Sequence, residues 1–222
     1  GCHASAVPNH QTLRSIPLAT RFNTAMFGLL GYELDMTLLT KQQRADVKEQ
    51  IAFYKKHRKL LQYGDFYRLR DPFEEDGCRW MVLSADKTRA IVGDFMNLLV
   101  PNGAQGPLRL TALEPEQLYR ITVRGQKIDI STFGGLVNYI VPMHLNPDGF
   151  LVRTAGKLFR LPTETESYVA SGSLLCAAGL FREQEFSGAG YSPNMRFTQD
   201  FDSRVYVLTA VEENPNLVPE AA

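Results

Sequence analysis

Apolar residues at spacings of three and four predict a helix over 17–30, early in the chain. Pro17 suits the first turn of a helix, and Gly31 supplies its stop. Short apolar runs at 2–7 and 32–36 lie on either side and are short enough for strands. The pattern therefore predicts a strand, a helix and a second strand in succession.

A second helix is predicted from Thr40 to about Tyr63. Thr40 and Gln43 have the spacing of a capping box, in which each side chain bonds the other residue's backbone N–H. Gly64 is a natural C-terminal stop. Many lysines and arginines lie on this helix, and we interpret them as a solvated face rather than a nucleic-acid contact.

After Gly64 the pattern changes to short runs rich in β-branched and aromatic residues, separated by Gly and Pro. The predicted strands are 80–84, 90–100, 108–112, 119–123, 127–131, 157–161, 167–170 and 204–211. Many short strands with turn signals between them predict an antiparallel β-sandwich over 65–222, with a frayed tail after about residue 213.

A domain boundary is thus predicted near Gly64, between an α/β part at 1–64 and an all-β domain at 65–222. Two strands and two helices cannot close a core alone, because a two-stranded parallel sheet leaves helix faces uncovered. The chain also begins at Gly1 rather than Met. We therefore expect residues 1–64 to be the end of a larger domain.

Charge and cysteine content narrow the function classes. Lys plus Arg and Asp plus Glu are both 24, which argues against a dedicated nucleic-acid or membrane-surface protein. Three widely spaced cysteines without a CxxC pair favour a reducing compartment over a disulfide scaffold. There is no apolar run of membrane-spanning length and no signal-like start, so a cytoplasmic location is predicted.

The sequence contains no GxSxG, HExxH, P-loop or GxGxxG signature of catalysis or nucleotide binding. Cys2, His3 and His10 could ligate zinc, but they have no fourth partner, so an ordinary loop is favoured. For Asp200 and Asp202, a turn in which a carboxylate pairs with an arginine is favoured over a calcium site.

Glu33 and Asp35 lie near the end of the predicted strand 32–36, just before a helix. In a βα barrel that edge holds the active site, and a spacing of two puts both carboxylates on one face of a strand. A structural role, in which one of them caps a backbone group or pairs with a basic residue, is the favoured alternative to catalysis.

An ordered set of motifs resembles the α-galactosidases of glycoside hydrolase family 36. The segments are HASAVPNHQ at 3–11, FN at 22–23, AMFG at 25–28, GYELD at 31–35, FYKK at 53–56, RKL at 58–60, QYGDFYRL at 62–69, PF at 72–73, GAGY at 188–191 and DFDSRVY at 200–206. Ala4, Ala19 and Cys176 depart from the residues common in the family, outside its known chemistry. The resemblance covers nearly the whole chain.

The resemblance implies the last two βα units of a (β/α)8 barrel followed by the family's C-terminal β domain. It also implies a parent enzyme that hydrolyses terminal α-linked galactose from melibiose or raffinose-type sugars by a retaining mechanism. The family's two catalytic Asp residues lie upstream of this chain, so the isolated chain is expected to be inactive. His3 and Ser5 are the best candidates for sugar contacts, and no cofactor or metal is implied.

The resemblance leaves open a homo-oligomeric parent. An alternative of another class is a non-catalytic carbohydrate-binding or assembly module formed by 65–222. Trp80 is the single tryptophan and lies in an apolar run, so core packing is favoured over a sugar platform.

Overall fold

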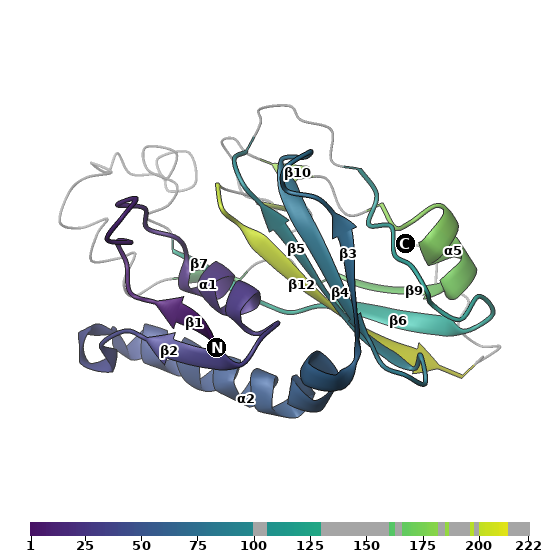
Figure 1. Ribbon diagram of the computed structural model, residues 1–222, viewed down its shortest axis with the longest axis horizontal. Helices are drawn as coiled ribbons and strands as arrows, with labels where there is room; N and C mark the ends of the chain where they lie inside the picture. Colours follow the sequence, from purple (N-terminus) through teal and green to yellow (C-terminus); the bar gives the residue numbers. More distant parts are fainter. Residues whose placement is uncertain are drawn as a thin grey trace, which may run out of the picture.

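The computed structural model describes residues 1–99, 106–129, 160–162, 166–181, 185–186, 196–197 and 200–212. A short βαβα segment is followed by a six-stranded sheet (Figure 1). The segment contains β1 (Cys2–Ser5), α1 (Leu18–Ala25), β2 (Leu30–Glu33), the 3-10 turn η1 (Met36–Leu38) and α2 (Lys41–Tyr63). No helix in the described part is long and apolar enough to cross a membrane.

Strands β1 and β2 pair in parallel, as predicted from the sequence, with His3 opposite Gly31. The predicted bounds 32–36 of the second strand are wrong, because β2 begins at Leu30 and ends at Glu33. Asp35 ends the strand by capping η1: its carboxylate accepts a 2.8 Å hydrogen bond from the backbone N–H of Thr37. This local bond competes with continued strand pairing.

Helix α1 follows Pro17 but ends at Ala25, before the predicted end at residue 30. The chain turns early at Gly28, where the Cys2 side chain packs so closely that a Cβ would lie 2.5 Å from its Sγ.

Helix α2 has the predicted bounds. The backbone N–H of Gln43 donates to the Thr40 hydroxyl at 3.1 Å, and the Gln43 side chain accepts from the Thr40 N–H at 2.9 Å. The capping box is therefore confirmed, as is the stop at Gly64, whose N–H bonds the Leu60 carbonyl.

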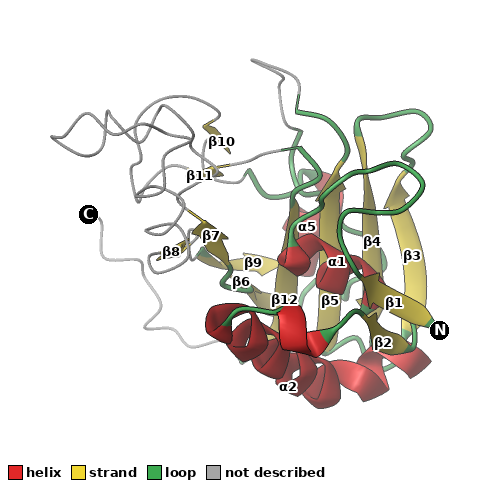
Figure 2. Cartoon of the chain, turned by 90° about the vertical axis from the view of Figure 1, so that its left-hand side faces the viewer, coloured by secondary structure: helices red, strands yellow, loops and turns green. Residues whose placement is uncertain are grey.

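Six antiparallel strands form the large sheet in the order β3-β4-β5-β12-β6-β9. They are β3 (Asp65–Arg70), β4 (Gly77–Leu83), β5 (Arg89–Met96), β6 (Leu118–Val123), β9 (Ser167–Ser171) and β12 (Ser203–Val211). The predicted strands 80–84 and 90–100 correspond to β4 and β5, which pair as an antiparallel hairpin and end at Leu83 and Met96. Figure 2 shows that α1 and α2 lie next to this sheet.

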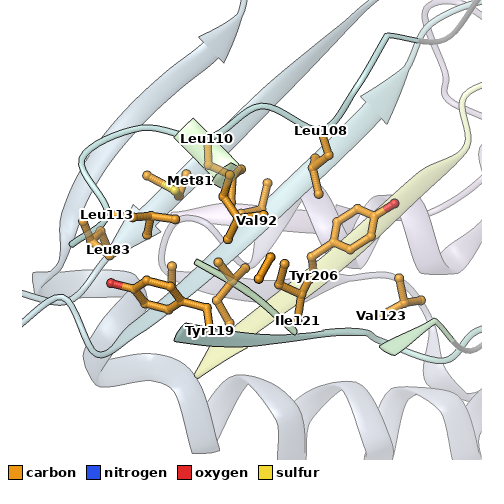
Figure 3. Close-up of a cluster of buried hydrophobic side chains, with 14 residues drawn as sticks. Met81, Leu83, Val92, Leu108, Leu110, Leu113, Tyr119, Ile121, Val123 and Tyr206 are labelled. Carbon is orange, nitrogen blue, oxygen red and sulfur yellow. The ribbon is translucent and has the colours of Figure 1, made fainter. Parts of the chain in front are cut away.

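Alternate residues of the central strands pack into two cores on opposite faces of the sheet. Met81 and Val92 belong to the core that faces α5 (Gly172–Ala177), together with Tyr119 and Tyr206 (Figure 3). Val82, Ile91 and Val205 instead pack against Phe22 and Met26 of the α1 segment and Tyr54, Leu60 and Leu61 of α2. The sheet therefore covers the helix faces that residues 1–64 could not cover alone.

The prediction of a strand at 108–112 is wrong. Leu108 forms only an isolated bridge with Leu180, and Ala112 has a φ of 57°. Leu108 and Leu110 are nevertheless buried against the α5 side of the sheet. The alternation in the sequence thus records burial of one side of a loop rather than a ladder of backbone bonds.

Two small strand pairs complete the described elements: β7 (Lys127–Asp129) with β8 (Arg160–Pro162), and β10 (Glu185–Phe186) with β11 (Arg196–Phe197). Four predicted features lie outside the described residues: 130–131 and 157–159 of two predicted strands, the GAGY motif at 188–191 and the tail after 212.

Candidate functional site

The sheet of β1 and β2 has one face toward the helices and one face away from them. Ala4 is fully buried, and the Tyr32 hydroxyl donates a 2.8 Å hydrogen bond to Gln50 of α2. Burial raises the pKa of Tyr32 well above its usual range, against the opposing effect of Arg124 and Arg21. Tyr32 is therefore a neutral structural group on the helix side.

Strand alternation puts His3 and Ser5 on the opposite face, with Gly31 and Glu33 beside them in register. Nδ1 of His3 lies 3.3 Å from the Glu33 carboxylate, and the two side chains are 51% and 73% exposed. The His3 ring lies close over Gly31, where a Cβ would be 2.7 Å from its Cδ2. This face thus presents an imidazole, a hydroxyl and a carboxylate that could hydrogen-bond a sugar.

The other sequence candidates have structural roles. Asp35 caps η1, and the hydrogen bonds from Thr37 lower its pKa. Asp202 pairs with Arg204 at 2.8 Å, which confirms the predicted arginine pair, and Asp200 accepts from the Leu99 N–H. Within the described part, no group of three or more His, Cys, Asp or Glu side chains could hold a metal.

Sequence reasoning missed Arg124, which reaches from the end of β6 toward the helices. Its guanidinium carbon lies 4.9 Å from the ring centroid of Phe22 and 5.3 Å from that of Phe53. Nη1 donates to Asn23 at 3.4 Å, and Nη2 lies 3.5 Å from the Glu49 carboxylate. Burial lowers its pKa, although the side chain remains a cation in this setting.

A buried polar cluster lies beside Arg124 and joins α1 to β12. The Ser203 hydroxyl is 2.9 Å from the Thr20 hydroxyl and accepts a 2.8 Å bond from the Asn23 amide. The Gln126 amide donates to the Ser203 carbonyl at 2.7 Å. Because the partners are more than 70 residues apart, no local pattern could have revealed this cluster.

A groove of about 570 Å³ runs between the start of β1, the outer side of α1 and the sheet. Cys2, His3 and Thr24 are among the residues that line it, and Phe27, Phe66 and Trp80 form an aromatic wall. The groove therefore shares His3 with the open face of β1 and β2. The ring centroids of Phe27 and Trp80 are 5.6 Å apart. Trp80 is thus only half-buried, and it closes the groove as well as packing inward.

Family comparisons match both parts of the chain. Residues 1–64 match the Melibiase model, and residues 78–208, more than half of the chain, match the Glycosyl hydrolase family 36 C-terminal domain. The chain belongs to glycosyl hydrolase family 36. This confirms the resemblance inferred from the sequence motifs.

Curated relatives in family 36 are α-galactosidases. Alpha-galactosidase AgaA of Geobacillus stearothermophilus is 48% identical over 121 residues, which are 54% of this chain and 17% of AgaA. The bifunctional alpha-galactosidase/sucrose kinase AgaSK of Mediterraneibacter gnavus is 40% identical over 119 residues, 54% of this chain and 13% of AgaSK. These matched segments therefore cover under one fifth of the length of the relatives.

Solved structures of family 36 match almost the whole chain. A variant of AgaA in complex with raffinose has a TM-score of 0.65 at 34% identity, over 95% of this chain and 22% of AgaA. The α-galactosidase from Lactobacillus brevis has a TM-score of 0.67 at 31% identity, over 96% of this chain and 22% of that enzyme.

Proposed function

We propose that this chain is the C-terminal part of a retaining α-galactosidase that removes terminal α-linked galactose from melibiose or raffinose-type oligosaccharides. In this proposal, β1 and β2 are the last two strands of a (β/α)8 barrel. The six-stranded sheet belongs to a C-terminal β-sandwich domain that begins near Asp65. The match to α-galactosidases over both parts of the chain, in the same order, is the observation that carries the proposal.

Retaining hydrolysis uses two carboxyl groups about 5–5.5 Å apart, one as nucleophile and one as acid and base. Glu33 is the one carboxylate on the open face of β1 and β2 in the described part, and Asp35 is held by Thr37. The isolated chain is therefore proposed to be inactive, with both catalytic carboxylates supplied by preceding barrel strands.

His3 and Ser5 are proposed to face the galactose from the seventh strand. Their side chains lie on the face that points away from the helices, which in a barrel is the interior. Glu33 would orient the imidazole of His3 through the 3.3 Å contact between them.

A chromogenic α-galactoside tests this function. We expect no turnover by the chain alone, and turnover when the part of AgaA that precedes its match to this chain is fused ahead of Gly1. The same fusion ending at the last AgaA residue is the negative control. Turnover by the purified chain alone, or none by a folded fusion, would contradict the proposal.

A further inference from the structure

The aromatic wall of the groove unites the two parts of the chain. Phe27 follows α1, whereas Phe66 lies on β3 and Trp80 on β4. The Phe27 and Phe66 ring centroids are 6.4 Å apart, and Phe66 is 46% exposed. A wall of partly exposed aromatic rings is typical of a surface that another apolar element covers.

The opposite side of the groove allows close approach of such an element. Thr20 and Thr24 lie one helical turn apart on α1, and Thr24 is exposed. The Thr24 hydroxyl donates to the Thr20 carbonyl at 2.9 Å, so it is satisfied within its own helix. A neighbouring apolar helix would therefore leave no unpaired hydroxyl at this position.

The free edge of β1 indicates where such an element would pack. Among the described strands, β1 pairs only with β2. Parallel strands in βα folds are joined by helices that pack on one face of the sheet, so a strand added to β1 brings a helix beside α1. The groove lies at this position, along the start of β1 and the outer side of α1.

We propose that the groove seats an amphipathic helix from the polypeptide that precedes this chain in the whole enzyme, and that Phe66 and Trp80 contact this helix directly. The inference rests on the proposed function and names a contact within it. The β domain would then help to assemble the barrel as well as cover α1 and α2. The length of the relatives leaves room for such a helix, since AgaA matches over only 17% of its length.

Two residues of the groove are natural probes of its occupancy. Trp80 is the single tryptophan, so tryptophan fluorescence, excited selectively over the nine tyrosines, reports on this wall alone. Cys2 is exposed on the other side, whereas burial and Asp94 raise the pKa of Cys78 to about 11, so that thiol should react more slowly. Peptide mapping after alkylation distinguishes Cys2 from Cys176.

The experiment compares the chain with a fusion in which a segment of AgaA is added ahead of Gly1. This segment is the strand and helix that immediately precede the match in AgaA, roughly 30 residues by the size of one βα unit. Any tryptophan in the added segment is replaced by Phe. We expect the Trp80 emission to shift to shorter wavelength and the alkylation of Cys2 to slow about tenfold, because both become covered.

Two variants of the fusion test the seat itself. Thr24→Arg places a long charged side chain in the groove, and Phe66→Ala removes part of the wall; both residues are exposed, so the fold should persist. Each should return Trp80 and Cys2 toward their values in the chain without the added segment. Matched controls are Ala45→Arg on the exposed side of α2 and Phe73→Ala, since Phe73 is 97% exposed; both should retain the protection.

Several outcomes would overturn the inference. Trp80 emission and Cys2 alkylation could be unchanged in a fusion whose added segment is helical, or the protection of Cys2 and Trp80 could survive Thr24→Arg. Alternatively, raffinose rather than the added segment could change the Trp80 emission. Finally, the chain could form a dimer in which Cys2 is already protected without the added segment. Hydrolysis does not enter any of these measurements. Failure of the groove contact is therefore distinguishable from failure of the proposed α-galactosidase function.

Discussion

Arg124 lies over the ring of Phe22, with its guanidinium carbon 4.9 Å from the ring centroid. The arginine comes from the end of β6 and the phenylalanine from α1, so the contact joins the sheet to the βαβα segment. A cation over an aromatic face is stabilising when both are shielded from water, and the Arg124 side chain is only 7% exposed. Arg124 therefore links the two parts of the chain, next to the buried cluster around Ser203.

Arg124→Ala should lower the free energy of unfolding by about 2–3 kcal/mol, since it removes the ring contacts and leaves Asn23 without its donor. Arg124→Met should lower it less, because the apolar stem continues to fill the space. Urea denaturation measures both, with Arg58→Ala on the exposed side of α2 as control. Equal losses for Met and Ala would show that the charge, not the packing, dominates.

Arg79 and Asp94 form a buried pair at 3.1 Å between β4 and β5, with side chains 8% and 10% exposed. Asp94→Asn should cost about 3–5 kcal/mol, because the guanidinium stays buried without a counter-charge. The double variant Arg79→Met with Asp94→Leu should recover most of this loss. The comparison is Glu75→Gln, which breaks an exposed pair with Arg70 and should cost about 1 kcal/mol or less. A double variant no more stable than Asp94→Asn would contradict the argument.

Local chemistry explains which parts of the fold were predictable. The capping box at Thr40 and the stop at Gly64 involve neighbours in the sequence, so the bounds of α2 followed directly. The prediction of a strand at 32–36 was wrong because the hydrogen bond between Asp35 and Thr37 favours a capped turn. Strand periodicity does not reveal such a bond.

The groove and the Arg124 contacts could not be predicted, because their residues meet only in the folded chain. Phe66 and Trp80 lie far from Thr24 in sequence, and the apolar run around Trp80 indicated burial on both sides. In the structure Val82 and Met81 do pack into opposite cores, while Trp80 at the end of the run is half-buried. His3 and Ser5 were found through family resemblance, and their shared face follows from strand alternation.

His57 should make stability pH-dependent. Burial, then Arg89 and Lys56, lowers its pKa from 6.5 to about 4. The unfolded state therefore binds more protons between these values, and the stability present above pH 6.5 is lost as the pH falls toward 4. His57→Gln should remove this pH dependence. The unfolding midpoints of the variant and of the unmodified chain should therefore differ by a constant amount above pH 7. Between pH 6.5 and 4 this difference should change. A pH-independent difference would contradict the shift.

Gly31→Ala should displace the imidazole of His3 from Glu33. A Cβ at Gly31 would lie 2.7 Å from Cδ2 of the ring, so the ring must turn and the 3.3 Å contact with the carboxylate must lengthen. The matched control is Gly125→Ala, because a Cβ at Gly125 meets nothing within 4 Å. NMR of the histidine ring protons should show a shifted His3 signal in the first variant and an unchanged one in the second.

The same pair of variants tests the proposed sugar contact in the active fusion with the preceding part of AgaA. If His3 holds galactose, Gly31→Ala should raise KM for the chromogenic galactoside about tenfold, the effect of losing a hydrogen bond of about 1.4 kcal/mol, while Gly125→Ala leaves it unchanged. His3→Ala should have at least the same effect, and Glu33→Gln, which keeps a hydrogen-bond acceptor near Nδ1, a smaller one. A displaced His3 signal without any change in KM would assign the imidazole a role in strand packing instead.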